Sequence, residues 1–411
     1  MRLELFERYV RRGELTLVEP NGTRHRFGSG TPKATWLIRK SDTLRRVLTH
    51  PALELGETYM NQGWDVADGS LWDLITILRS NMSDLVQQRT VFSELAALMQ
   101  TWNALTASFK NVHHHYDLDE ELFRAFLDRG MHYSCAYFRD PDMSLESAQL
   151  AKCNHIAHKL LVEPGQQVLD IGCGWGSLAL HLAETVGDSV VGLTLSAEQL
   201  RVAQAEAVRR GVSDRVEFRL QDYREHRGQY DRIVSVGMFE HVGRRNFKHY
   251  FEQLARQLRP QGVALLHTIG STRPPNSTNA WFRRHIFPGG HIPSLSTVAA
   301  AIERAGLMIG DLEILRPHYA LTLKEWNRRF QAQRAHFAAT KGERFCRMWE
   351  FYLVTSQTAF EHGDLVVFQF QLGGRDTPFP ATRDYLYRGL YGSADEHLAT
   401  PFTSAALPRH E

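Results

Sequence analysis

The sequence predicts an α/β fold, in which a doubly wound, mostly parallel sheet follows a small mixed α/β N-terminal domain. Three observations support this fold class. From about residue 165, apolar strand segments alternate with helical segments, the order that builds a parallel sheet. A glycine-rich turn joins the first of these strands to its helix. Before about residue 110, short strand segments are separated by turn residues such as Asn21 and Gly22.

The N-terminal elements are predicted by strand-like runs and by the helical spacing of apolar residues. Strands are expected at residues 14–20, 23–27 and 34–38. Two helices should follow, each with its apolar residues on one face: Leu71, Leu74, Ile75 and Leu78 in the first, Leu95 and Leu98 in the second. We assign residues 1–109 to this domain and expect it to contact lipid.

Residues 110–411 form the second predicted domain. Its first strand, Val168–Ile171, precedes a helix with apolar residues four apart. Ser196 and Gln199 belong to a capping box that opens the next helix, and Gly211 ends it. The remaining elements are strands at residues 189–195, 215–220, 232–236, 263–268, 312–315 and 365–372, and a helix at 245–258 before Pro260. Ligands of such a sheet bind beyond the carboxyl ends of its strands.

Composition narrows the class of protein. The 411 residues are 43% hydrophobic and 23% charged, as in ordinary globular chains. With 48 basic and 46 acidic residues, the net charge of +2 is too small to indicate nucleic-acid binding. The four cysteines have no CxxC spacing, so neither a zinc site nor a disulfide framework is predicted.

The expected location is cytoplasmic, with peripheral contact to the inner face of the cell membrane. Glu4 and Glu7 interrupt the apolar residues at the start, so no secretory signal is predicted. No uncharged apolar run approaches the roughly 18 residues of a spanning helix. The first candidate for membrane contact is a basic amphipathic segment near the start, with Arg2, Arg8, Arg11 and Arg12 beside Leu3, Leu5, Phe6 and Val10. The alternative is that its apolar face packs on the protein itself. A second candidate is residues 281–284, within a long aromatic insertion at residues 270–296.

The glycine-rich turn reads VLDIGCGWG at residues 168–176 and predicts a nucleotide-type ligand. A strand–helix turn without a ligand is the alternative. A dinucleotide fingerprint would place its third glycine one position later and an acid where Thr194 stands. S-adenosylmethionine has no pyrophosphate and therefore suits the shorter turn. Asp222 and Tyr223 could receive its adenine, unless they form only a solvated turn.

Several motifs together resemble the cyclopropane-fatty-acyl-phospholipid synthase family, which includes the mycolic acid cyclopropane synthases. Besides the glycine-rich turn, they are HHYDL at 114–118, MHYSCAYF at 131–138, GLTLSAEQ at 192–199 and SVGMFEHVG at 235–243. YMNQGW at 59–64 is similar to a stretch of the phospholipid enzymes, which carry the additional N-terminal domain. The resemblance implies a Rossmann-like class I methyltransferase fold.

The resemblance also implies an activity and a set of residues. The family transfers a methyl group from S-adenosylmethionine to a cis double bond of an acyl chain, here in membrane phospholipid, and a cyclopropane forms. The implied cofactor residues are Tyr133, Ser134, Asp170, Gly172, Gly174, Gly176, Thr194, Leu195, Ser196, Gln199, Asp222, Tyr223 and Arg224. The implied catalytic residues surround a bicarbonate that acts as the base: Cys135, Glu240, His267, Ile269 and Tyr319.

Two departures from the family pattern affect the expected chemistry. The motif at 114–118 is followed by an unusual DEELF. Ser356 stands where relatives often have a cysteine, which argues against a covalent thiol. We expect no metal, because the adjacent histidines at 113–115 point apart. A homodimer is possible.

Three functions remain open. The preferred one is cyclopropane formation. A fatty-acid C-methyltransferase would instead leave a methyl branch or a methylene group. A lipid-binding protein with an inactive methyltransferase core is the third, although the intact motifs weigh against it. Acyl length, double-bond position and head group do not follow from the sequence.

Overall fold

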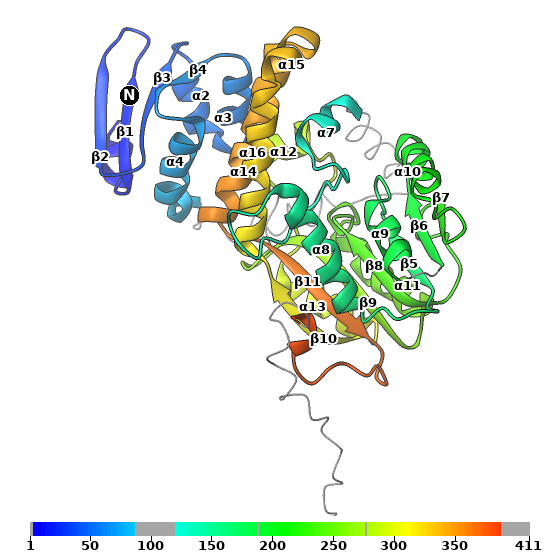
Figure 1. The fold of residues 1–411 in the computed structure, drawn as a ribbon. Helices are drawn as coiled ribbons and strands as arrows, with labels where there is room; N and C mark the ends of the chain where they lie inside the picture. Colours follow the sequence, from blue (N-terminus) through cyan, green and yellow to red (C-terminus); the bar gives the residue numbers. More distant parts are fainter. Residues whose placement is uncertain (1–2, 87–119, 187–188, 276–277, 388–411) are drawn as a thin grey trace, which may run out of the picture. The chain divides into compact units, whose positions relative to one another are not determined.

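The structure, a computed structural model, describes residues 3–86, 120–186, 189–275 and 278–387 (Figure 1). The described residues up to Thr377 form one compact unit, and the described residues from Pro378 on, with the short helix η3 (Asp384–Leu386), belong to another. The predicted domain boundary at 109/110, the second N-terminal helix and the histidine triplet lie outside the described residues. Within the described ranges, no helix has both the length and the hydropathy needed to cross a bilayer.

The N-terminal part contains a four-stranded mixed sheet in the order β2-β1-β3-β4. The three predicted strands are present with bounds shifted by one or two residues, and β4 was not predicted. β1 pairs antiparallel with β2 and parallel with β3. The elements are α1 (Glu4–Tyr9), β1 (Gly13–Val18), β2 (Arg24–Ser29), β3 (Lys33–Ile38), α2 (Thr43–Thr49), α3 (Pro51–Met60), β4 (Trp64–Asp68) and α4 (Leu71–Val86).

The second sheet has seven strands in the order β10-β11-β9-β8-β5-β6-β7, which confirms the predicted doubly wound, mostly parallel fold. Five neighbouring strands run parallel, and β11 pairs antiparallel with both β9 and β10. The chain moves outward from β5 to β6 and β7, then returns to β8 on the other side of β5. The strands are β5 (Val168–Ile171), β6 (Val190–Thr194), β7 (Val216–Leu220), β8 (Tyr230–Val236), β9 (Leu258–Ser271), β10 (Met308–Ile314) and β11 (Leu365–Gly373).

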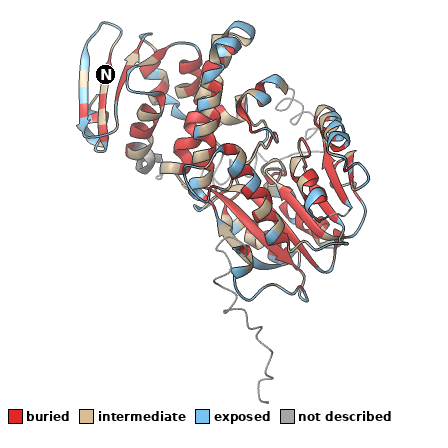
Figure 2. Cartoon of the chain, viewed as in Figure 1, coloured by how far each residue is buried: buried red, intermediate tan, exposed pale blue. Residues whose placement is uncertain are grey.

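Helices cover this sheet, whose strands are largely buried (Figure 2). At α10, the Ser196 hydroxyl accepts the amide proton of Gln199, and Gly211 ends the helix at φ +67°, as the capping box predicted. The helix predicted at 245–258 is present as α11, and β9 begins at Leu258, five residues before the predicted strand at 263–268. The helices are α7 (Glu120–Phe126), α8 (Leu145–Leu160), α9 (Ser177–Val186), α10 (Ala197–Arg210), η1 (Phe239–His241), η2 (Arg244–Asn246), α11 (Phe247–Gln257), α12 (Ala280–His285) and α13 (Leu295–Arg304).

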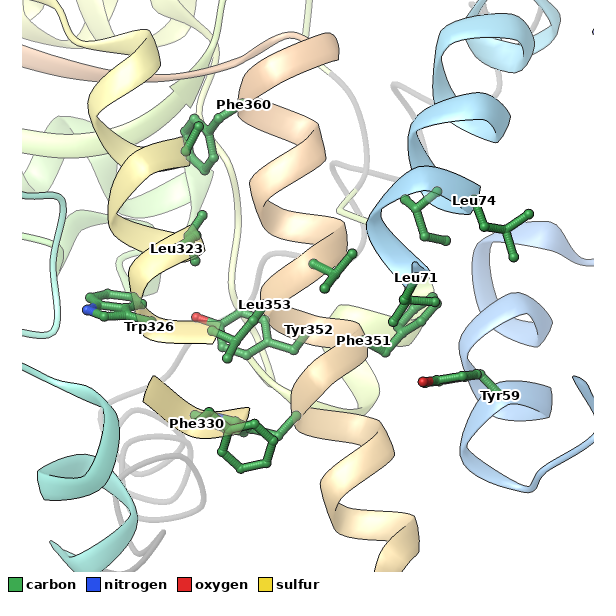
Figure 3. Packing of buried hydrophobic residues seen from close by; sticks show 14 of the residues in the cluster. Tyr59, Leu71, Leu74, Leu323, Trp326, Phe330, Phe351, Tyr352, Leu353 and Phe360 are labelled. Atoms are coloured by element: carbon green, nitrogen blue, oxygen red, sulfur yellow. The ribbon is translucent and has the colours of Figure 1, made fainter. Parts of the chain in front are cut away.

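Three consecutive helices between β10 and β11 were not predicted: α14 (Arg316–Ala332), α15 (Arg334–Lys341) and α16 (Glu343–His362). Figure 3 shows α16 with Leu353 and Tyr352 among side chains of α14, and with Phe351 near Tyr59 and Leu71 of the N-terminal helices. The ring centroids of Phe351 and Tyr59 are 5.8 Å apart. The N-terminal sheet and the helices before β11 therefore share one apolar core.

Both segments proposed to touch a membrane turn their apolar side chains inward. Phe6 packs on Phe27, with ring centroids 5.5 Å apart, and both Phe6 and Val10 are buried. In the insertion, Trp281 is buried and its Nε1 donates to the sulfur of Met60. Phe6, Val10 and Trp281 are therefore covered by the protein core, and contact of these segments with a membrane stays a prediction.

Candidate active site

A pocket lies where the sheet reverses direction, at the carboxyl ends of β5, β6 and β8. This is the edge at which a doubly wound sheet binds its ligand. Most of the predicted cofactor residues line it: Tyr133, Ser134, Asp170, Gly172, Gly174, Thr194, Leu195, Gln199, Asp222, Tyr223 and Arg224. Gly176 and Ser196 are not among the lining residues; the first packs inside the fold and the second caps α10.

The glycines of the glycine-rich turn have different structural roles. The amides of Gly172 and Cys173 both donate to the carbonyl of Leu193, at 2.9 and 2.8 Å, which joins the turn to β6. Gly174 has φ +56°, and a Cβ there would meet none of the described atoms within 4 Å. A Cβ on Gly176 would instead lie 2.7 Å from the ring of Phe218. Gly174 therefore keeps the pocket open, whereas Gly176 allows close packing.

The end of the pocket at β6 and β7 carries polar groups that are already oriented by one another. The Thr194 hydroxyl donates to Gln199 Oε1 at 2.8 Å, and both residues are buried. The Asp222 carboxylate accepts two hydrogen bonds from the Arg224 guanidinium, at 2.9 and 2.6 Å, and this contact raises the pKa of Arg224. Tyr223 packs edge-on against Tyr250. These contacts fix the side chains before any ligand binds.

The opposite end of the pocket holds buried ionisable side chains, of which the sequence analysis identified only Asp170. Among the described residues, Asp170 Oδ2 has no hydrogen-bond partner, and burial raises the Asp170 pKa to about 7. Lys152 donates from Nζ to the Ser134 hydroxyl at 3.0 Å, and burial lowers its pKa. His132 also lines this end. Lys152 could have been noticed from the sequence, because it interrupts the apolar face of α8.

A second polar group lies beyond the ends of β8 and β9. Glu240, in η1, accepts the amide proton of Ile269 at Oε1 over 2.6 Å. Its Oε2 is buried and makes no hydrogen bond of good geometry with the described residues, although the nearby Thr268 hydroxyl acts to lower the Glu240 pKa. Burial raises the Glu240 pKa to about 7. This carboxyl group can therefore exchange a proton near neutral pH.

His267 lies two residues before Ile269 on β9 and is buried. Burial lowers its pKa to about 3, so the ring is neutral at physiological pH. Its Nδ1 lies 3.1 Å from Gln369 Nε2. If this amide donates to Nδ1, the ring proton lies on Nε2, and His267 is available as a neutral donor.

Cys135 and Tyr319 belong to one buried apolar cluster, against which Ile269 packs. Burial raises the pKa of the Cys135 thiol, and its Sγ lies 3.3 Å from the carbonyl oxygen of Ala136. This supports a positional role rather than a nucleophilic one. Tyr319 lies on α14, with its ring 4.8 Å from that of Phe360. Among the five catalytic candidates, Glu240 and Ile269 are joined to each other by a hydrogen bond.

An aromatic wall separates the pocket from α16. The Tyr133 ring stacks on Trp326 at 5.2 Å, and its hydroxyl lies 2.8 Å from the Tyr352 hydroxyl. Tyr352 in turn contacts the rings of Phe282 and Phe287 in the insertion. In the part of the chain that the structure describes, no cluster of three or more His, Cys, Asp or Glu side chains could hold a metal ion.

Comparison with known proteins finds matches for two parts of the chain. The family model for mycolic acid cyclopropane synthetase matches residues 103–370, and a domain of unknown function matches residues 9–90. The cyclopropane-fatty-acyl-phospholipid synthase of Escherichia coli strain K12 is 39% identical over 83% of this chain and 88% of its own. The tuberculostearic acid methyltransferase UfaA1 of Mycobacterium tuberculosis is 36% identical over 87% of each chain.

A solved structure extends the comparison to the ligand. The mycolic acid cyclopropane synthase CmaA1, complexed with SAH and CTAB, superimposes with a TM-score of 0.60 and 35% identity. The match covers 64% of this chain and 97% of that one.

Proposed function

Since the chain belongs to the mycolic acid cyclopropane synthetase family, and is an S-adenosylmethionine-dependent methyltransferase, we propose that it converts cis double bonds of phospholipid acyl chains into cyclopropanes. The observation that carries this proposal is the buried Glu240 carboxyl group. It lies beside an apolar cluster, has an unpartnered oxygen among the described residues and titrates near neutrality. Cyclopropane formation needs a proton acceptor in such an apolar site.

We place the cofactor in the pocket beyond β5, β6 and β8. Its methionine end lies at Tyr133, Ser134 and Asp170, where the unpartnered Asp170 oxygen suits an ammonium group. Its ribose lies at Thr194 and Gln199, and its adenine lies at Asp222 and Tyr223. The glycine-rich turn supports this placement, because Gly174 leaves space for the ligand backbone.

The chemistry has two stages. The π electrons of the alkene attack the cofactor's methyl carbon, the carbon–sulfur bond breaks, and its electron pair remains on sulfur. The resulting carbocation loses a proton from the new methyl group, and that carbon–hydrogen electron pair closes the ring. The chain's own task is to exclude water and to accept this proton.

A bicarbonate ion fits the residues near Glu240 and, when bound, would supply the base. We propose the Tyr319 hydroxyl and the Nε2 proton of a neutral His267 as the donors to this anion. Glu240 itself engages the Ile269 amide, so its unpartnered oxygen would meet the hydroxyl group of bicarbonate. In the simpler alternative, Glu240 removes the substrate proton directly.

The experiment that tests the product is expression in a bacterial strain that lacks cyclopropane fatty acids, followed by proton NMR of its lipids. Cyclopropane protons, which resonate upfield of other lipid signals, would support the proposal. A methyl branch or a methylene group would instead support a C-methyltransferase, in line with the name of the tuberculostearic acid relative. Unchanged lipids in cells that contain folded, cofactor-binding protein would support an inactive, lipid-binding relative.

The proposed substrate requires contact with a membrane. Because Phe6 and Val10 are buried, we propose that residues 1–109 contribute charge rather than an inserted apolar face, through the exposed Arg8, Arg11 and Arg12. Sedimentation with anionic vesicles should decrease as salt increases. Binding that is insensitive to both lipid charge and salt would contradict this mode of contact.

A further inference from the structure

Two lysines of α8, Lys152 and Lys159, are buried, and their positions place them on the same face of the helix. The ammonium group of Lys159 lies 2.6 Å from a carboxylate oxygen of Glu313 and 3.4 Å from one of Asp311. Such partners are expected, because a charge that is buried without an opposite charge is costly. Lys159 therefore has its counter-charges within the protein.

Lys152 differs from Lys159 in this respect. Among the residues that the structure describes, no carboxylate forms an ion pair with Lys152, and the charges of Asp128 and Asp170 act on it only from a longer distance. Asp128 is also engaged elsewhere, because its Oδ2 lies 2.8 Å from Nδ1 of His132 and accepts the amide proton of Gly130 at 2.8 Å. A buried ammonium group is thus left without a contacting counter-charge from the described chain.

The side chain of Lys152 reaches the wall of the cofactor pocket. Its Nζ donates to the Ser134 hydroxyl at 3.0 Å, which uses one of the three protons of an ammonium group. Because the Ser134 oxygen accepts this bond, its own proton is available to a second acceptor. Ser134 is itself held in place, since Gln149 donates to its carbonyl at 3.0 Å. Two hydrogen-bond donors are therefore positioned together at one end of the pocket.

The same end of the pocket also presents a carboxyl group. Asp170 lines the pocket, and its Oδ2 has no hydrogen-bond partner in the described part of the chain. The amino-acid end of S-adenosylmethionine carries the complementary groups, an ammonium and a carboxylate on one carbon atom. When bound, each would favour the ionised form of the side chain that it meets. The match therefore does not depend on how Lys152 and Asp170 are protonated in the empty pocket.

We propose that Lys152, together with the Ser134 hydroxyl, binds the α-carboxylate of the cofactor and so selects ligands with an intact amino-acid end. The inference rests on the proposed placement of the cofactor in this pocket. A carboxylate at this position would receive charge-assisted hydrogen bonds away from bulk water. An adenosine derivative without the carboxylate would leave the Lys152 charge buried and unpaired, so the site would reject it.

Calorimetric titration of the full-length chain with three ligands tests the proposal. The ligands are S-adenosylhomocysteine, its decarboxylated analogue and 5′-methylthioadenosine, which lacks both the amino and the carboxyl group. Lys152→Met replaces the ammonium group with an apolar chain of similar length. It should weaken S-adenosylhomocysteine by roughly 10- to 100-fold, the range for hydrogen bonds to a charged group. The other two ligands, which have no carboxylate, should bind at least as tightly as they bind to the parent.

Two further variants separate the two charges of the pocket from a general loss of charge. Asp170→Asn should weaken both ligands that carry the ammonium group and leave 5′-methylthioadenosine within about twofold of the parent. Lys248→Met removes an exposed lysine of α11 that pairs with Glu252 at 3.6 Å. Because Lys248 does not line the pocket, this variant should bind all three ligands as the parent does.

The outcomes distinguish the inference from the proposed function. If Lys152→Met weakens all three ligands equally, or leaves the affinity for S-adenosylhomocysteine unchanged, the assignment of the carboxylate to Lys152 is wrong while the cofactor site stands. If Lys152→Met does not fold, Ser134→Ala decides instead, and it must weaken S-adenosylhomocysteine more than the decarboxylated analogue. If the parent binds none of the three ligands, the placement of the cofactor fails first.

Discussion

The amide proton of Ile269 is donated to Glu240 Oε1 over 2.6 Å, which joins the short helix after β8 to the carboxyl-terminal part of β9. The contact fixes one oxygen of a buried carboxyl group and leaves the other for a ligand or a proton. In the proposed reaction, Glu240 therefore either removes the proton or orients the anion that does so.

Replacing Glu240 tests that account. Glu240→Gln keeps an oxygen for the Ile269 amide but loses the titrating group, so turnover should fall by about 10²- to 10⁴-fold, the usual contribution of a general base. Cofactor affinity should stay close to that of the parent, because Glu240 is not among the pocket-lining residues. Glu303→Gln, on the exposed side of α13, is the matched control and should not change turnover.

The role of bicarbonate is tested separately. In decarbonated buffer the turnover of the parent should fall, and added bicarbonate should restore it. Tyr319→Phe should weaken this rescue, because it removes a hydroxyl donor to the anion. Full activity of the parent without bicarbonate, together with an inactive Glu240→Gln variant, would identify the carboxylate as the base.

Substitutions at two glycines of the same turn should impair the protein for different reasons. Gly174→Val places a side chain in the open space of the pocket and should greatly weaken cofactor binding, as measured by calorimetry. Gly176→Ala should instead lower the free energy of unfolding, because its Cβ meets Phe218. Gly211→Val carries a similar backbone strain at φ +67°, about 1–3 kcal/mol, away from the pocket. It should leave cofactor affinity unchanged.

The buried His267 should make the protein sensitive to acid. Its folded-state pKa of about 3 lies below the ordinary value of 6.5, so the unfolded chain takes up the proton first as the pH falls. Stability is therefore lost as the pH decreases from 6.5 toward 3. His267→Gln should reduce the slope of unfolding free energy against pH by about 1.4 kcal/mol per pH unit. Urea unfolding at several pH values measures this, and the exposed His249→Gln should leave the slope unchanged.

Arg347 on α16 should be important for stability. Its guanidinium donates to the carbonyls of Tyr59 and Trp64, at 2.6 and 2.9 Å, and lies 3.9 Å from the Tyr59 ring centroid. Arg347→Met would remove both hydrogen bonds together with the ion pair between Arg347 and Asp65 at 3.0 Å, and we expect a loss of about 3–5 kcal/mol in urea unfolding. A loss below 1 kcal/mol, no larger than that of the exposed Arg344→Met, would contradict this role.

The sequence predicts the parallel sheet well where a short apolar run ends at a distinct turn. Val168–Ile171 and the helix capped by Ser196 are the clearest cases. The three helices before β11 were missed for a physical reason. α16 is buried on several sides, from Cys346 to Phe360, and so lacks the single apolar stripe that identifies a helix.

The sequence likewise predicts some residues of the candidate site and misses others. Motifs place Gly174, Thr194 and Asp222 at one sheet edge, because parallel strands end there together. Lys152 and His132 were missed, because they reach the pocket from segments upstream of the sheet and belong to none of its strand-end motifs.

The shared core around α16 has a consequence for synthesis of the chain. Tyr59 emerges early from the ribosome, yet the guanidinium that caps its carbonyl belongs to a residue 288 positions later. Domains usually fold in the order in which they are made. Here the first strands and helices complete their packing only after nearly the whole polypeptide has appeared, so the nascent N-terminal segment must remain protected from aggregation until α16 arrives.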